Sequence, residues 1–193
     1  MTVDALRHGA HPLWTRRQRV AQRTLFALST GPGANQGDVA YMGRRWLDAS
    51  ASESLDLAGG LVDAFGAAAT FAQVKVLRLV ADRANLNSVI VGGAAANAFA
   101  GPFGGATHTL KVPPGGVLLL VAPGATAWAV TADTADILKI ANGGAGSGVG
   151  YELEILGVTT PPAPDPDPDP DPGEGGGTLD FSDPDNSGNF PAL

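Results

Sequence analysis

Glycine and proline divide this chain into short apolar runs, and this division constrains the fold more than any other feature. The 193 residues include 27 glycines and 15 prolines, which is above average usage for both. Short runs bounded by Gly, Pro, Asn or Asp favour strands over long helices. The candidate strands span 25–29, 39–47, 53–57, 71–80, 88–93, 107–112, 116–122, 127–131, 137–141 and 149–156.

Nine or ten short strands at this spacing are typical of a sandwich or jelly roll. We therefore predict an all-β fold: an antiparallel β-sandwich or jelly-roll-like domain with a flexible N-terminal arm and a Pro/Asp-rich C-terminal tail. The continuously apolar run 116–122 predicts a central strand covered on both faces. The alternating run 149–156 predicts a half-buried strand. Only 61–72 admits a helix, and Gly66 in its middle disfavours one by about 1 kcal/mol.

The segment PPAPDPDPDPDPGEGGG marks the end of the folded domain. Proline fixes φ and removes the N–H donor, which excludes helix and central strand, and the aspartates repel one another. Residues 161–172 would reach about 37 Å as a polyproline II helix. We divide the chain into an Arg-rich arm (1–23), a β-sandwich domain (24–158), a Pro/Asp/Gly linker (159–177) and a terminal peptide (178–193).

Charge is distributed unevenly along the chain, whose net charge is −7. The first 45 residues carry seven Arg and two Asp, whereas the residues from 159 onward carry eight acids and no base. Such asymmetry is typical of ends that meet different surroundings, although a solvated arm and tail explain it equally well. The partner-binding hypothesis names the basic side chains of the arm and the apolar ones that return after the linker: Arg16, Arg17, Arg19, Arg23, Phe181, Phe190 and Leu193.

No pattern in the sequence indicates catalysis, and we predict that the chain is not an enzyme and holds no metal or cofactor. Cysteine is absent, and His8, His11 and His108 lack further ligand or catalytic partners in the pattern. The loop GGAGSGVG (143–150) lacks the following helix of a dinucleotide site and is interpreted as a hairpin loop. TGPGANQG lacks the Lys-Ser/Thr of a phosphate loop and is interpreted as a turn. Trp46 and Trp128 lie in candidate strands and are expected in the core.

The sequence also bears on location and partners. It has neither the apolar stretch of a signal peptide nor a run of about 18 apolar residues, so we expect a soluble protein without membrane contact. Five Arg in 23 residues could contact nucleic acid. The acidic chain as a whole argues against that partner, and docking onto an acidic protein surface explains the arm equally well.

The stretch from about residue 30 to 157 resembles a family of small structural proteins of tailed-phage virions, usually encoded near the head genes. The resemblance lies in the phrases TGPGANQGD, LDLAGGLVDAFG, TFAQVKVLRL, VIVGGAAANAF, PPGGVLLLVAP, AWAVTADTADILKIAN and YELEILG. It implies a virion component that decorates or stabilises a particle, without catalysis or cofactor. The arm before residue 23 and the Pro-Asp tail depart from the family's pattern.

These observations together predict a capsid decoration or cement protein. We expect it to stabilise the head, bind the major capsid protein or neighbouring virion subunits, and form a homo-oligomer. It would be assembled into the virion in the bacterial host cytoplasm. The alternative is a tail or fibre module that binds a receptor or carbohydrate, for which an exposed Trp or Tyr beside carboxylates would be needed.

Overall fold

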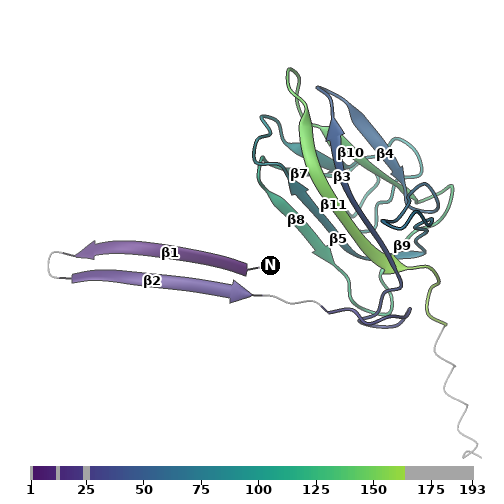
Figure 1. Ribbon diagram of the computed structural model, residues 1–193, viewed down its shortest axis with the longest axis horizontal. Helices are drawn as coiled ribbons and strands as arrows, with labels where there is room; N and C mark the ends of the chain where they lie inside the picture. Colours follow the sequence, from purple (N-terminus) through teal and green to yellow (C-terminus); the bar gives the residue numbers. More distant parts are fainter. Residues whose placement is uncertain (1, 12–13, 24–26, 164–193) are drawn as a thin grey trace, which may run out of the picture. The chain divides into compact units, whose positions relative to one another are not determined.

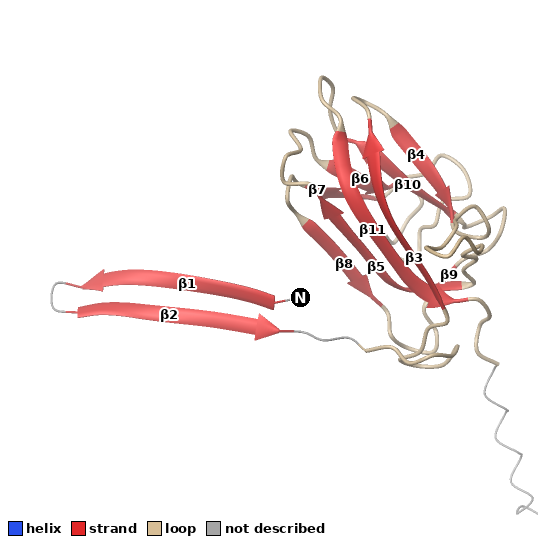
Figure 2. Ribbon diagram, in the orientation of Figure 1, coloured by secondary structure: helices blue, strands red, loops and turns tan. Residues whose placement is uncertain are grey.

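A computed structural model describes residues 2–11, 14–23 and 27–163, with side chains from residue 27 onward. Within these residues the fold is all-β, as the sequence predicts, and no helix is present to cross a membrane (Figure 2). The strands are β1 (Thr2–His11), β2 (Trp14–Arg23), β3 (Val39–Leu47), β4 (Ser52–Asp56), β5 (Gln73–Ala81), β6 (Val89–Gly92), β7 (Thr109–Val112), β8 (Val117–Val121), β9 (Trp128–Ala129), β10 (Ile137–Asn142) and β11 (Val149–Val158).

Two antiparallel sheets pack face to face and form the predicted sandwich (Figure 1). One sheet has the order β3-β11-β5-β8, with β9 also paired to β5, and the other has the order β4-β10-β6-β7. The core between them is made of side chains that alternate along each strand. Tyr151, Leu153 and Ile155 on β11 are fully buried, whereas Glu152 is exposed, so the predicted half-buried strand is confirmed.

The prediction that residues 116–122 form a central strand is wrong. β8 lies at the edge of its sheet and pairs with β5 alone. Leu118 and Leu120 pack against the core, while Val117 is 46% exposed. The central strands of the sheet are β11 and β5 instead. An apolar run can therefore mark an edge strand whose second face is left apolar, a case that the pattern alone does not separate from a buried strand.

Other segments differ from the predicted boundaries. Residues 27–29 contribute only an isolated bridge between Ser29 and Gln36, and the run 127–131 is reduced to the two residues of β9. The loop 143–148 joins strands of different sheets, β10 and β11, so it is not the expected hairpin loop. The segment 61–72 forms a tight loop rather than a helix, with a bridge between Val62 and Ala68.

The N-terminal arm is paired with itself. β1 and β2 form a separate two-stranded antiparallel sheet over ten residue pairs, from Thr2 opposite Arg23 to His11 opposite Trp14. No strand is predicted before residue 25, because the apolar residues of the arm follow no regular period. Backbone hydrogen bonding between adjacent segments does not need that period. Residues 164–193, which hold most of the linker and the terminal peptide, lie outside the described residues.

Candidate functional site

The outer face of the β3-β11-β5-β8 sheet carries four rows of side chains that the strand register places next to one another. Exposed Ala40, Met42, Arg44 and Trp46 alternate along β3, so they share one face of the sheet. The register then gives the rows Ala40–Leu156–Val76–Val121, Met42–Glu154–Arg78–Leu119, Arg44–Glu152–Val80–Val117 and Trp46–Gly150.

Ion pairs divide this apolar face. Arg78 on β5 contacts Glu154 on β11 at 2.5 Å, and Arg44 on β3 contacts Asp82 at 3.0 Å. The hydrogen bond and the charge of Asp82 raise the pKa of Arg44. These pairs are partly or largely exposed, so they contribute little to stability. Their effect is to fix where positive and negative charge lie on a face that is otherwise apolar.

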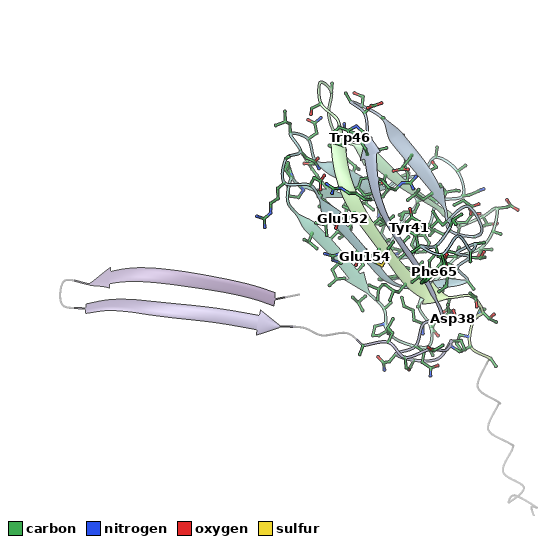
Figure 3. All side chains as sticks on the ribbon, in the orientation of Figure 1. Asp38, Tyr41, Trp46, Phe65, Glu152 and Glu154 are labelled. Atoms are coloured by element: carbon green, nitrogen blue, oxygen red, sulfur yellow. The ribbon has the colours of Figure 1, made fainter. Side chains whose placement is uncertain are left out.

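A hollow of about 320 Å³ opens on this face between β3 and β11. Met42 and Arg44 line it from one strand, and Glu152 and Glu154 line it from the other. Figure 3 shows the two glutamates along β11, with Trp46 near one end of the sheet. The hollow therefore combines an apolar side chain, a guanidinium and two carboxylates at the edge of the sheet.

Trp46 is not a core residue, which corrects the sequence-based expectation. Its side chain is 63% exposed, and its ring lies over Gly148 and Gly150, where no side chain keeps it away from the strand. The indole N–H donates to Asp48 at 3.3 Å. Trp46 lies two residues after the exposed Arg44 on β3, so both side chains point to the same face of the strand. This alternation could have predicted from the sequence that Trp46 is exposed. Trp128, in contrast, is partly buried against the core.

Phe65 is the most exposed large apolar residue that the structure describes, with 95% of its surface accessible. It stands in the loop 61–69, in which the Asp63 carboxylate accepts hydrogen bonds from the backbone N–H groups of Phe65 and Ala67, both at 2.8 Å. Gly66 follows with a φ of +85°. The loop is thus held by its own hydrogen bonds while it displays an aromatic ring to solvent.

The segments that lead to the arm and to the linker meet at one end of the sandwich. The backbone N–H of Asp38 donates to Gly157 at 3.0 Å, and the Asp38 carboxylate accepts from the N–H of Thr159 at 2.8 Å and from its hydroxyl at 3.1 Å. A hollow of about 210 Å³ beside them is lined by residues of both segments, including Leu28 and Leu156. The two attachments, the N-terminal arm and the C-terminal linker, therefore join the sandwich at the same end.

The loop before β3 is fastened by a buried lysine. Lys75 is fully buried, and its ammonium donates to the carbonyl oxygen of Gly33 and to that of Pro32, the latter at 3.3 Å. Burial lowers the pKa of Lys75, and the charge of Asp38 opposes that shift. The loop TGPGANQG is therefore a turn, as predicted, and its carbonyl groups point toward a cation of the protein itself.

A second polar cluster joins the two sheets. Glu53 on β4 contacts Arg45 on β3 at 2.5 Å and accepts a hydrogen bond from the buried hydroxyl of Tyr151 on β11. Arg45 also donates to the hydroxyl of Tyr41 at 3.0 Å. The hydrogen bond to Glu53 raises the pKa of Arg45, and burial, aided by Glu53, raises that of Tyr151. The members of this cluster bind one another, and their contacts link β4 of one sheet to β3 and β11 of the other.

The described residues contain no group of three or more His, Asp or Glu side chains that could hold a metal ion. His108 is exposed, and its Nδ1 lies 3.1 Å from the carbonyl oxygen of Phe103. His8 and His11 lie on β1, where only the backbone is described. The absence of catalysis stays a prediction.

The residues predicted to bind partners belong to the arm and to the terminal peptide. Arg16, Arg17, Arg19 and Arg23 lie on β2, opposite Gly9, His8, Leu6 and Thr2, and their side chains are not described. Phe181, Phe190 and Leu193 lie outside the described residues. Met42 and Phe65 were not predicted to be exposed, and Trp46 was expected in the core, although alternation along β3 could have revealed that Met42 and Trp46 are exposed.

Comparison of the chain with protein-family models, with curated proteins and with solved structures finds no match.

Proposed function

We propose that this chain is a non-catalytic structural protein of a tailed-phage virion, and that it decorates the capsid and stabilises the head. The observation that carries the proposal is the common origin of the arm and the linker beside Asp38 and Thr159. A body whose two attachments begin at one end can be fastened to a surface there while its remaining faces stay free. The resemblance of residues 30–157 to phage structural proteins supports the same role.

The N-terminal hairpin supports attachment to a partner. A two-stranded hairpin is marginally stable in water when it stands alone, and β1 and β2 form a sheet of their own. The five Arg residues of the arm would pair with acidic groups on the major capsid protein or on neighbouring subunits. Binding to the particle would thereby stabilise the hairpin.

Copy number in purified particles tests the proposal. We expect hundreds of copies per virion, measured by quantitative mass spectrometry against the major capsid protein. A handful of copies per particle, or recovery only with detached tails, would contradict head decoration. Particles from which the protein is missing should recover resistance to heat and to low salt when the purified chain is added.

The arm can be tested in the same assay. Deleting residues 1–22 should weaken binding to particles, while the melting temperature of the sandwich stays within a few degrees. Reversing the charge of Arg16, Arg17 and Arg19 should act similarly, and added salt should mimic the reversal. Unchanged occupancy of the particles by the deletion variant would show that the arm is not the attachment.

One observation favours the alternative of a tail or fibre module that binds carbohydrate. Trp46 is exposed, its indole N–H donates to Asp48, and its ring and the Asp82 carboxylate both border the space above Gly150. An aromatic ring beside carboxylates is typical of a sugar-binding site. A glycan array with the intact chain and with Trp46→Ala separates the two functions. Binding that is lost in the variant would favour the alternative over head decoration.

A further inference from the structure

β3 is the longest edge strand of the two sandwich sheets, and it lacks most of the features that usually keep an edge from pairing with another chain. It spans nine residues, Val39–Leu47, and its register with β11 is unbroken over all nine pairs. The other edges of the two sandwich sheets are shorter: β4 and β8 have five residues each, and β7 has four. Prolines also bound β8 at positions 113, 114 and 123. Short strands, prolines and bulges protect edges, and β3 has none of them.

An inward-pointing charge is another common protection, and Arg45 occupies such a position on β3. The charge of its guanidinium is already paired with Glu53, which lies 2.5 Å away, and the Tyr41 hydroxyl accepts a further hydrogen bond from it. Arg45 therefore does not prevent a strand from adding to this edge. The row of outward-facing backbone groups on β3 has no neighbour in the part of the chain that the structure describes.

We propose that β3 pairs in an antiparallel manner with β3 of a second copy of this chain, around a two-fold axis that passes midway between the two copies of Gly43. The two copies would then share one continuous sheet, in which the row of strands runs from β8 through β3 to β8 of the second copy. The proposal does not depend on the proposed function, since it concerns the protein free in solution.

The register follows from symmetry. A two-fold axis perpendicular to the sheet places outer-face residues opposite outer-face residues, so one residue of β3 must lie directly opposite its own copy across the axis. Gly43 is the midpoint of Val39–Leu47, and centring there is the only choice that pairs all nine residues. Centring on Arg44 would place two guanidinium groups opposite each other, which is unfavourable.

The side chains that meet in the Gly43 register are complementary. Met42 faces Arg44 of the second copy, and Ala40 faces Trp46 of the second copy. The arriving Arg44 would lie beside Met42 at the rim of the hollow that Glu152 and Glu154 line, so its positive charge approaches two carboxylates. Gly43 lies opposite its own copy in this register and adds no side chain there.

A pair of opposite substitutions at Met42 tests this register in the full chain. Met42→Arg places two like charges opposite each other twice per dimer, so we expect the dissociation constant to rise roughly tenfold. Met42→Glu places a carboxylate opposite Arg44, so we expect the dimer to be as tight as the native one or tighter. Sedimentation velocity over a concentration series measures both.

The same experiment separates pairing from folding. Within one copy Met42 lies opposite Glu154, so Met42→Arg should make the folded chain more stable and Met42→Glu should make it less stable. The expected effects on the dimer have the opposite order. Val117→Arg on the other edge of the sheet is the matched control and should leave the dimer unchanged. A native chain that stays monomeric, or equal weakening by both Met42 variants, would overturn the proposal.

Disulfide cross-linking tests the register directly. The chain contains no cysteine, so the introduced cysteines are the only ones that can react. Ala40→Cys and Trp46→Cys should form a disulfide when the two variants are mixed. Neither should cross-link with itself, because identical residues would lie about 20 Å apart along the paired strands. Leu86→Cys, at a site that is 80% exposed, controls for random collision. Cross-linking of the single variants at the rate of the mixture would exclude the Gly43 register.

Discussion

The buried hydroxyl of Tyr151 makes the stability of the sandwich depend on pH in the alkaline range. Its pKa is raised by burial and by the hydrogen bond to Glu53, so the folded state favours the protonated phenol. The unfolded chain loses this proton near pH 10. The stabilisation is therefore complete below pH 10 and is lost as the pH rises above it.

We expect the free energy of unfolding to fall above pH 10 by about 1.4 kcal/mol per pH unit more steeply in the native chain than in Tyr151→Phe. Denaturant titrations of both proteins at several pH values measure the difference. The comparison cancels the titration of the remaining groups, because these are shared. Parallel curves for the two proteins would show that the phenol ionises in the folded state.

Lys75 gives a second prediction at this scale. Replacing it with Met removes the donor to the Pro32 and Gly33 carbonyl groups but keeps the buried apolar part of the side chain. We expect the loop 30–37 to open more readily, so that the Gly37 amide, which donates to Ser29, exchanges its hydrogen roughly tenfold faster. Amides of β11 should be unaffected, and uniform acceleration would indicate global destabilisation instead.

At the scale of the strands, Gly157 decides how β11 and β5 pair. Their register shifts between Leu156 and Gly157, and a Cβ on Gly157 would collide with the backbone carbonyl of Gln73 and come within 2.8 Å of the Phe71 ring. Backbone atoms cannot move away without breaking the pairing. Gly157 is therefore a position where β11 and β5 approach too closely for any side chain.

Gly157→Ala should lower the free energy of unfolding by about 2–4 kcal/mol, as measured by chemical denaturation. Gly59→Ala is the matched control, since nothing lies within 4 Å of a Cβ at that position, and it should change stability by less than about 0.5 kcal/mol. Equal effects of the two substitutions would show that the close approach at Gly157 is not the cause.

Alternation and turn residues predicted the strands well where one face is buried and the other is exposed to solvent. The buried Tyr151, Leu153 and Ile155 on β11 are an example. The sequence pattern did not predict features that depend on contacts between distant segments. The apolar run of β8 does not reveal that the strand lies at an edge, and the arm pairs through backbone groups that carry no side-chain signal. The exposure of Phe65 was not predicted, because it depends on a loop conformation that the Asp63 carboxylate holds by accepting the Phe65 N–H.

At the scale of the whole molecule, the sandwich should fold without its attachments. We expect a fragment spanning residues 24–158 to fold alone, with a far-UV circular dichroism spectrum typical of strands. A fragment that extends to residue 162 regains the hydrogen bonds between Thr159 and Asp38 and should be more stable by about 1 kcal/mol. A spectrum dominated by helix would contradict the fold.

The terminal peptide is expected to dock on a partner, because large apolar residues return after the linker. Phe181→Ser combined with Phe190→Ser should lose a competition with the intact chain for limiting particles. Each buried phenylalanine would contribute on the order of 2 kcal/mol before the cost of ordering the peptide. Equal occupancy, with equal protease sensitivity of free and bound tails, would show that the peptide is a frayed end.

The meeting of the two attachments beside Asp38 also sets how the molecule would bear mechanical load. Tension between the arm and the linker would first load the loop that Lys75 holds before β3, and then the pair of Val39 and Gly157, where β3 meets the end of β11. Such a force would peel β3 from β11 one hydrogen bond at a time, starting at this end, rather than shear all nine pairs together. When the arm and the linker are both fixed to one support that expands, this tension passes through the junction at that end, and the rest of the sandwich carries no load until the junction opens.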